Sequence, residues 1–244
     1  MARSPEDQGA RYAIYFVPPP SSRLYRYGSA ILGYDCYTGG DVPFPDGFGG
    51  GAVNWNELTA TPRRYGFHAT LKAPFFLAPS CTEQQLVKAL QNFASLGHAV
   101  HGFTPALREL EDFIAMVPRE PEASLNALAA SCTTIFDAYR APMSPQERAR
   151  RLASRLSQSQ IQNLDRWGYP YVLAEFRFHM TLTGAVPQRR KQAVLAALRD
   201  GLHHMKVEPS MTIERLALMK QDTPDAAFRV LEEAVLEVGA IARD

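Results

Sequence analysis

The 244-residue sequence has no long hydrophobic run, almost no net charge and few cysteines, and each shortage excludes a class of protein. No stretch approaches the ~18 apolar residues that a membrane-spanning helix needs. The formal net charge is +1, so no overall field would attract nucleic acid or an anionic membrane. Cys36, Cys81 and Cys132 form no CxxC pair, and the first residues lack an apolar secretory segment. We therefore expect a cytoplasmic protein that has no membrane partner.

Strand and helix patterns alternate along the chain. Runs of β-branched and aromatic residues predict strands over 11–17, 65–76, 103–117, 172–186, 211–219 and 227–238, and 103–117 and 172–186 each form either one strand or two strands with a break. Helical patterns cover 81–96, 122–139 and 187–205, and Ser144-Pro145-Gln146-Glu147 is typical of a capped helix start. The second half therefore repeats the first in outline, which predicts an α+β fold. We expect one bilobal domain over residues 1–244, with lobes at about 11–140 and about 141–238 that can exchange strands.

A five-residue phrase occurs twice in this chain. Phe67-His68-Ala69-Thr70-Leu71 recurs as Phe178-His179-Met180-Thr181-Leu182, although the chain has only six histidines. Three shared flanking identities around two histidines favour an internal repeat over coincidence. Each copy places an imidazole and a hydroxyl two residues apart.

Strand geometry separates the residues of each copy onto two faces, because side chains alternate along a strand. The apolar members of both copies then share a core face: Phe67, Ala69, Leu71, Phe178, Met180 and Leu182. The other face carries polar side chains that suit a cleft: Arg64, His68, Thr70 and Lys72 in the first copy, and Arg177, His179, Thr181 and Thr183 in the second.

The two polar faces together hold the groups that phosphoryl chemistry needs. An imidazole pKa of about 6.5 allows one histidine to be neutral and the other protonated near neutral pH. The neutral one can take a proton from water while the other gives a proton to a leaving oxygen. Hydroxyls can donate to the non-bridging oxygens, and cations can offset charge in the transition state.

Other interpretations of these residues remain open at this level. A single His-x-Thr carries almost no information. A metal site is the more specific alternative to an acid–base pair, because histidine is a common metal ligand. The nearest acids to the two motifs are Glu57 and Glu175. Two residues after each motif histidine the side chain is threonine, rather than a second histidine or a carboxylate that could bind a metal. The arginine-rich helix after Ser144 can either grip RNA or form a solvated face. Its arginines are Arg148, Arg150, Arg151 and Arg155.

Two His-x-Thr strands about 110 residues apart resemble the two-histidine (2H) phosphoesterase superfamily. Longer phrases resemble the branch encoded beside phosphonate-utilisation genes. These are Arg11-Tyr-Ala-Ile-Tyr-Phe16, Arg64-Tyr-Gly-Phe-His-Ala-Thr-Leu-Lys-Ala-Pro74, Trp167-Gly-Tyr-Pro-Tyr-Val172 and Phe176-Arg-Phe-His-Met-Thr-Leu-Thr-Gly184. The resemblance runs from about residue 11 to 238.

The resemblance implies a fold, a reaction and a set of site residues. The fold would be bilobal with a pseudo-two-fold, its two antiparallel sheets framing a central groove and its helices outside. The reaction would be metal-independent, cofactor-free hydrolysis of a cyclic phosphodiester on a small ribose-derived or nucleotide substrate, in phosphonate catabolism. His68 and His179 would be the acid–base pair, and Thr70 and Thr181 would hold the phosphate. From their positions beside the motifs we add the substrate-binding candidates Arg64, Tyr65, Lys72, Arg177 and Thr183, and we add Tyr15 as a residue expected to line the groove.

Two other functions fit the same residues. The protein could act on RNA ends, as a 2′,3′-cyclic phosphodiesterase or a 2′-5′ ligase-like enzyme, with RNA as its partner. It could instead be a non-catalytic protein that binds a phosphorylated metabolite. The sequence does not distinguish acid from base, hydrolysis from ligation, or one oligomeric state from another.

Overall fold

A computed structural model describes residues 9–48, 54–207 and 210–237, and these form an α+β fold with antiparallel sheets. The predicted domain ends at 1 and 244 and the predicted lobe end at 238 lie outside the described residues. The strands are β1 Arg11–Phe16, β2 Tyr34–Asp35, β3 Gly40–Asp41, β4 Ala69–Phe76, β5 Val100–Phe103, β6 Pro105–Leu110, β7 Phe113–Pro118, β8 Met180–Thr181, β9 Met211–Ile213, β10 Arg215–Gln221 and β11 Arg229–Val235. The helices are α1 Arg23–Leu32, α2 Trp55–Arg63, α3 Glu83–Leu96, α4 Ala123–Ile135, α5 Pro145–Leu152, α6 Gln158–Trp167 and α7 Gln188–His204, with short 3-10 turns at Phe136–Tyr139 and Leu173–Glu175.

One large sheet runs through the described part of the chain in the order β11-β10-β1-β4-β8-β7-β6. Its neighbouring strands are all antiparallel. The sheet narrows at its middle, where a single residue pair, Ala69 with Met180, joins β4 to β8. The strands on either side of that pair come from both halves of the sequence, so β1 lies beside β10 and β7 lies beside β8.

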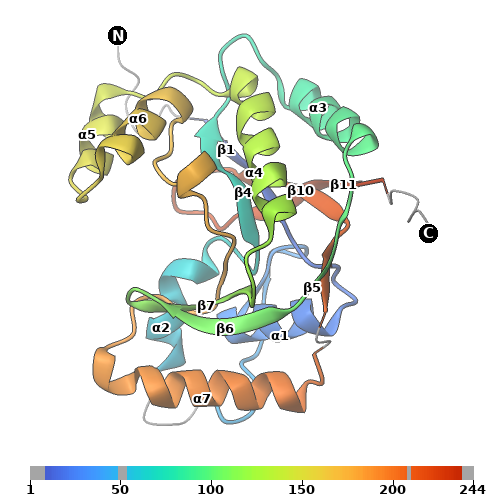
Figure 1. Ribbon diagram of the computed structural model, residues 1–244, viewed down its shortest axis with the longest axis vertical. Helices are drawn as coiled ribbons and strands as arrows, with labels where there is room; N and C mark the ends of the chain where they lie inside the picture. Colours follow the sequence, from blue (N-terminus) through green and yellow to red (C-terminus); the bar gives the residue numbers. More distant parts are fainter. Residues whose placement is uncertain (1–8, 49–53, 208–209, 238–244) are drawn as a thin grey trace.

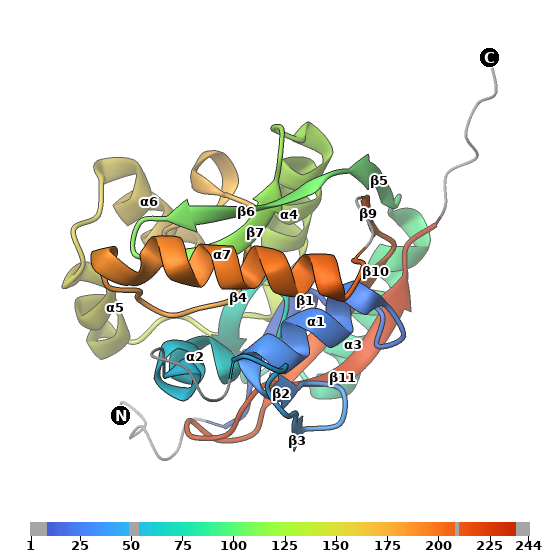
Figure 2. The same ribbon diagram turned by 90° about the horizontal axis from the view of Figure 1, so that it is seen from below.

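The helices cover the two wings of this sheet (Figure 1). In that view α3 and α4 lie with the upper wing, whereas α1, α2 and α7 lie with β6 and β7 below. Helices α5 and α6 form a pair at one side of the upper wing, close to β4 in both views (Figures 1 and 2). Between them, Arg148 on α5 donates two hydrogen bonds to Asp165 on α6, at 2.6 and 2.9 Å.

Local sequence signals account for several helix starts. Thr82 caps α3 in a reciprocal box with Gln85, and the predicted cap at Ser144 accepts from the Glu147 amide at 3.1 Å. Pro145 occupies the first turn of α5, where its missing N–H costs nothing. The Glu147 carboxylate accepts a hydrogen bond from Arg151 instead of from the Ser144 amide, so the reciprocal capping box is incomplete. Glu147 and Arg151 therefore form a charged pair on one face of α5.

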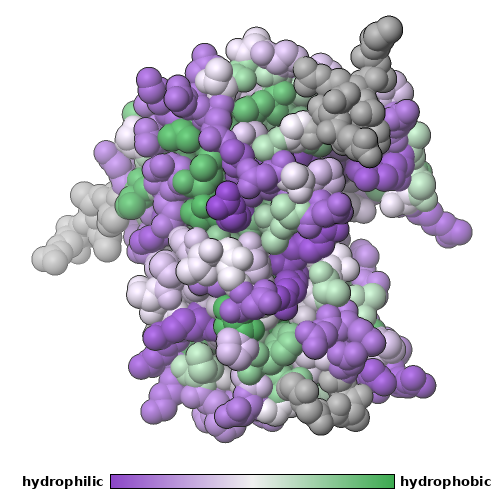
Figure 3. Space-filling model, turned by 180° about the vertical axis from the view of Figure 1, so that it is seen from behind, coloured by the Kyte–Doolittle hydropathy of each residue, from purple (hydrophilic) through white to green (hydrophobic). Residues whose placement is uncertain are grey.

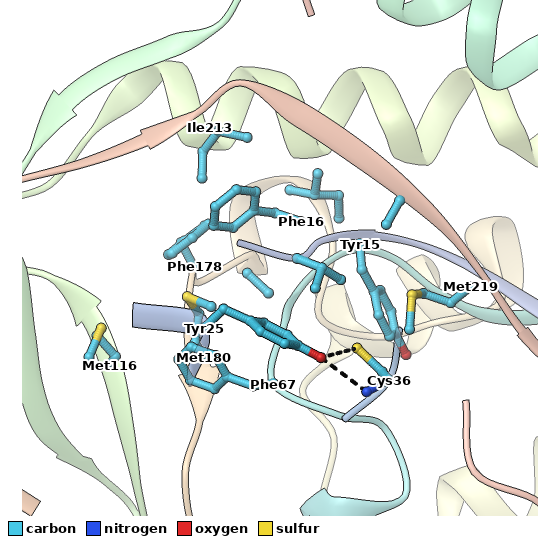
Figure 4. Packing of buried hydrophobic residues seen from close by; sticks show 14 of the residues in the cluster. Tyr15, Phe16, Tyr25, Cys36, Phe67, Met116, Phe178, Met180, Ile213 and Met219 are labelled. Atoms are coloured by element: carbon cyan, nitrogen blue, oxygen red, sulfur yellow. Dashed lines mark hydrogen bonds between the residues drawn. The ribbon is translucent and has the colours of Figure 1, made fainter. Parts of the chain in front are cut away.

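The apolar faces of the two copies meet in the core, as predicted. Phe67, Phe178 and Met180 are all nearly inaccessible to solvent and lie together in Figure 4, with Tyr15 and Phe16 of β1 nearby. A Cβ on Gly28 would come within 2.2 Å of the Phe67 ring, so only glycine in α1 leaves room for that ring. Packing on this face therefore holds the polar faces of both copies toward the opposite side.

The strand predicted over 172–186 is wrong for most of its length. Residues 173–175 form a 3-10 turn in which Leu173 has a left-handed φ of 55°, and only Met180–Thr181 pairs as a strand. The amides of both Leu182 and Thr183 then donate to the Ile114 carbonyl, which ends the regular ladder. The first motif strand likewise starts at Ala69 rather than residue 65, because Gly66 has a left-handed φ of 72°.

On the side opposite to Figure 1, hydrophilic residues predominate and hydrophobic ones form separate patches, most clearly at the upper left (Figure 3). Within the described ranges, none of the helices combines the length and the apolar character that crossing a bilayer requires.

Candidate active site

The two repeated motifs lie side by side at the narrow middle of the sheet. The antiparallel pairing of Ala69 with Met180 places His68 opposite Thr181 and Thr70 opposite His179. Directly opposed residues point to the same face, and adjacent strands are about 5 Å apart. The fold therefore joins the two imidazoles and the two hydroxyls in one constellation related by a local two-fold.

Both imidazoles are oriented by the same local contact. Nδ1 of His68 lies 2.8 Å from the carbonyl oxygen of Gly66, and Nδ1 of His179 lies 2.8 Å from that of Arg177. Because a carbonyl oxygen only accepts, each Nδ1 carries the hydrogen and each neutral ring has Nε2 as its acceptor. The same tautomer in both copies leaves two matching nitrogens for proton transfer.

His68 is enclosed more tightly than its counterpart. Its ring stacks on Tyr15 with centroids 3.8 Å apart, and its Nε2 lies 3.1 Å from the Thr70 hydroxyl. The pKa of His68 is lowered to about 4, mainly by burial, with the Gly66 carbonyl opposing the shift and the nearby His179 adding to it. His68 is therefore neutral near pH 7.

His179 has a different aromatic neighbour. The Phe113 ring lies 5.8 Å from it at a tilt, rather than in a stack. Burial lowers the pKa of His179, and the bond to the Arg177 carbonyl acts in the opposite sense. The two-fold thus holds for the backbone and breaks down in the surroundings of the rings.

A cleft of about 740 Å³ opens beside this constellation, and His68 is among the residues that line it, whereas His179 is not. Its lining includes Thr70 and Thr181 from the motifs, and three of the predicted substrate-binding residues, Tyr15, Arg64 and Tyr65. Burial raises the pKa of Tyr15 well above its usual value, so its phenol stays protonated. The Tyr65 ring stacks on Phe228, with centroids 5.5 Å apart.

The prediction that Lys72 faces the cleft is wrong. Its Nζ is buried and donates to the Thr133 carbonyl at 3.0 Å and to Asp137 at 3.2 Å. The pairing of β1 with β4 shifts register between Thr70 and Lys72, so strict alternation fails there and Ala73 lines the cleft instead.

Two other predicted ligands play structural parts. The buried Thr183 hydroxyl accepts from the Ile114 amide at 3.0 Å and only borders a smaller pocket. The side chain of Arg177 is exposed, and it is the Arg177 carbonyl that contacts His179. The regular strand that would have brought both side chains to the cleft covers only Met180–Thr181, so Arg177 lies before it and Thr183 after it.

The structure adds residues that strand phase did not identify. Arg11 from the start of β1, Arg150 and Arg151 from α5, and Tyr169 all line the cleft. A signal for the α5 residues was present, because Ser144, Glu147 and Arg151 recur at the helical spacing of one face. That spacing does not show that this face of α5 lines the cleft.

A second pocket of about 260 Å³ shares His68, Tyr65 and Thr181 with the cleft. The rest of its lining is mostly small or apolar and includes Pro62 and Phe113, with Asp112 as the charged member. His68 therefore lies between a basic cleft and a largely apolar pocket.

Glu175, the acid nearest the second motif, is hydrogen-bonded to α6. Its carboxylate accepts from Ser159 at 2.7 Å and from Gln160 at 2.9 Å. Within the residues that the structure describes, no three His, Cys, Asp or Glu side chains gather in a metal-binding arrangement.

Comparisons with known proteins place the chain in a family. Residues 70–229, which include Thr70, His179 and Thr181, match the family described as "Protein of unknown function (DUF1045)". The chain is 33% identical over 231 residues to the ribose 1,5-bisphosphate phosphokinase PhnN of Janthinobacterium sp. (strain Marseille), and 34% identical over 220 residues to the protein of that name from Laribacter hongkongensis (strain HLHK9). The alignments cover 93% and 90% of the chain but 51% and 50% of the relatives, so the chain spans about half the length of the curated relatives it matches.

Two solved structures are similar to the chain over most of its length. One is E. coli LigT complexed with 3'-AMP, at a TM-score of 0.40 and 14% identity, covering 93% of this chain and 98% of that one. The other is the conserved protein of unknown function ATU0111 from Agrobacterium tumefaciens str. C58, at a TM-score of 0.44 and 12% identity, covering 96% and 89%.

Proposed function

This chain belongs to the family described as "Protein of unknown function (DUF1045)", and we propose that it is a phosphoesterase of the two-histidine type that opens a cyclic phosphodiester. One observation carries the proposal. His68 and His179 directly precede two paired strands, and each has its Nδ1 fixed on a carbonyl 2.8 Å away, so that both rings present Nε2 for proton transfer next to the cleft that His68 lines. That arrangement suits a reaction in which one proton is removed and another supplied.

His68 is the general base in this proposal. The buried ring that stacks on Tyr15 is neutral, and its Nε2 can accept a proton from water. In the free protein the Thr70 hydroxyl donates to that nitrogen, and a bound phosphoryl oxygen can take over the hydroxyl and leave Nε2 to the water. The water oxygen then forms a bond to phosphorus as its proton passes to His68.

His179 is the general acid. A phosphodiester anion beside an imidazole favours the protonated ring, which offsets the lowering of its pKa by burial. As the bond from phosphorus to the ring oxygen of the substrate breaks, that oxygen takes the proton from Nε2. Thr181 and Arg64 on the cleft wall can donate to the non-bridging oxygens, where charge increases in the transition state. The product is a phosphomonoester with a free hydroxyl.

The substrate proposed is small and derived from ribose. Relatives that match the chain over half their length are named for a kinase of ribose 1,5-bisphosphate, which supports a ribose phosphate as ligand and a place in phosphonate breakdown. The contacts of α5 favour this over RNA. Arg148 is bonded twice to Asp165, and Arg150 and Arg151 line the cleft, so the helix does not present one continuous basic face.

The test is hydrolysis of nucleoside 2′,3′-cyclic phosphates in the presence of EDTA. We expect wild-type turnover, and losses of roughly 10²–10⁴-fold in His68→Ala and His179→Ala, the usual contribution of acid–base groups. His204→Ala is the matched control, because its Nδ1 also bonds a carbonyl, that of Asp200 at 2.7 Å, on an exposed helix end. Equal rates in all four proteins, or a rate abolished by the chelator, would refute the mechanism.

A further inference from the structure

The two copies of the repeat have unlike neighbours on the strands that flank them. In the first copy, Tyr15 of β1 lies directly opposite Thr70. In the second copy, Ala115 of β7 takes that place opposite Thr181. The local two-fold that exchanges β4 with β8 therefore also exchanges these two positions. A phenol ring on one side of the site corresponds to a single methyl group on the other.

The Tyr15 ring covers one face of the His68 imidazole. The two rings are nearly parallel, at an angle of 18° with centroids 3.8 Å apart, and the Phe228 ring lies 6.1 Å from Tyr15 at a tilt. Tyr15 is only 1% exposed and belongs to the buried cluster shown in Figure 4. A molecule in the cleft can therefore contact His68 but can reach little of the Tyr15 ring.

The Tyr15 hydroxyl reaches the same imidazole through Thr70. Directly opposed residues on paired strands point to the same face of the sheet. Burial raises the pKa of the Tyr15 phenol, and a hydrogen bond with Thr70 acts in the opposite sense. The Thr70 hydroxyl in turn lies 3.1 Å from Nε2 of His68. Tyr15 thus contacts one imidazole by its ring and the threonine bonded to that imidazole by its hydroxyl.

His179 has no equivalent neighbour at the matching position, because the methyl group of Ala115 cannot stack on an imidazole. The Phe113 ring is tilted by 56° and lies 5.8 Å away. The Nδ1 contacts of the two histidines are nevertheless equal, at 2.8 Å each. The difference between the two imidazoles therefore originates on the flanking strands and not within the repeated motifs.

We propose that Tyr15 is a positioning residue that makes His68 the base of the pair, because its ring fixes the plane of the imidazole and keeps water from one face, without itself binding the substrate. This role rests on the proposed function and deepens it, since it gives a reason why two matching motifs take different parts in one reaction. Removing water from an imidazole favours its neutral form, and only the neutral form accepts a proton.

Charged and titratable side chains also surround His68, and a change at Tyr15 leaves them in place. Those from other elements that line its two pockets are Arg11 of β1, Asp112 before β7, Glu147, Arg150 and Arg151 of α5, and Tyr169 after α6. Arg64 and Tyr65 come from its own segment. Burial is the main cause that lowers the pKa of His68, and His179 is the titratable neighbour that adds to it. A pKa that changes when Tyr15 is replaced therefore reports on burial.

The test is an NMR titration of histidine side chains labelled with 15N, in the free protein, from about pH 8 to about pH 4.5. Wild-type His68, with its pKa of about 4, should stay largely neutral over this range. Tyr15→Leu should raise the pKa of His68 by at least about 1, toward the ordinary value, whereas Tyr15→Phe keeps the stacked ring and should leave it unchanged. The matched control is Tyr12→Leu, because Tyr12 is a buried tyrosine of the same strand whose hydroxyl donates to Glu83 at 2.7 Å.

Turnover of a nucleoside 2′,3′-cyclic phosphate gives the kinetic readout. We expect kcat at neutral pH to fall at least about tenfold in Tyr15→Leu and to stay within about threefold of wild type in Tyr15→Phe and Tyr12→Leu. KM should stay within about threefold in all three variants, because the substrate does not contact the ring. If Tyr15→Leu does not fold, Tyr15→Met takes its place in both measurements, since the flexible methionine side chain fills irregular gaps.

A His68 pKa that does not move in the Leu or Met variant, or that moves as far in Tyr12→Leu, would overturn the positioning role. A rise in KM in both Tyr15→Leu and Tyr15→Phe, with kcat and the pKa of His68 unchanged, would instead make Tyr15 a substrate ligand. The titration needs no substrate, so it is independent of the catalytic proposal. A wild type that hydrolyses no cyclic phosphodiester, while the pKa of His68 responds as expected, contradicts the catalytic proposal alone.

Discussion

Substitution of Gly66 by alanine should damage both the fold and the proposed active site. Gly66 has a φ of 72°, which alanine adopts only with strain. Its carbonyl accepts from Nδ1 of His68 at 2.8 Å. A Cβ at this position would lie 2.7 Å from the Cβ of Cys36, which is buried and held by Tyr25. Neither the Cys36 side chain nor the backbone of residue 66 can move freely, so the strain should distort the peptide whose carbonyl orients His68.

The size of the effect can be separated into two parts with a matched control. Gly102 has nearly the same φ, 74°, but a Cβ there meets nothing within 4 Å. Gly102→Ala should therefore cost only the backbone strain, about 1–2 kcal/mol of unfolding free energy. Gly66→Ala should cost that amount plus an overpacking contribution of about 1–3 kcal/mol, which gives roughly 2–5 kcal/mol.

Urea denaturation at pH 7.5 would measure both variants beside the wild type. Turnover of a cyclic phosphodiester in buffer without urea, in which each protein is folded, gives the second readout. We expect kcat to fall in Gly66→Ala by at least about tenfold and to stay within about twofold of wild type in Gly102→Ala. Equal destabilisation of the two variants together with an undiminished kcat in Gly66→Ala would show that the Gly66 turn does not position His68.

Two further predictions concern protonation and buried charge. The folded pKa of His68, about 4, lies below the ordinary value near 6.5, so protonation favours unfolding, and the stability that the neutral ring contributes should be lost as pH falls from about 6.5 to about 4. Urea midpoints at pH 7.5 and pH 4.5 should differ more for wild type than for His68→Gln, and equal differences would contradict this. Lys72→Met should lower the unfolding free energy by about 1–3 kcal/mol, because Asp137 keeps Arg140 as a partner, while KM stays within about twofold. A large rise in KM with normal stability would instead place Lys72 in the site.

The parts of the site that were predictable from the sequence depend on contacts between near neighbours. The alternation of apolar and polar residues is visible within each five-residue motif. Burial of Phe67 and Phe178 on one face leaves His68 and His179 on the other. Helix starts were equally local, since a cap such as Ser144 needs only the amide three residues later.

The errors arose where a distant segment interrupts that local order. Alternation along β4 fails at Lys72 because β1 pairs with it through a shifted register, and Asp137, 65 residues away, supplies a buried partner. The segment after Thr181 leaves the ladder because the Ile114 carbonyl accepts from the amides of both Leu182 and Thr183. Neither event has a signature within a few residues of the position that it affects.

Sequence alone was enough to identify the histidine and threonine pairs, their shared phase and the chemistry that they can support, because side-chain type and strand period are properties of short segments. The three-dimensional fold was needed to show that the pairs meet through one residue pair, that His68 stacks on Tyr15, and that α5 turns two arginines toward the cleft. These features depend on packing between distant segments, such as those of Ala69 and Met180, which are 111 residues apart, and the whole core rather than either segment determines which segments pair.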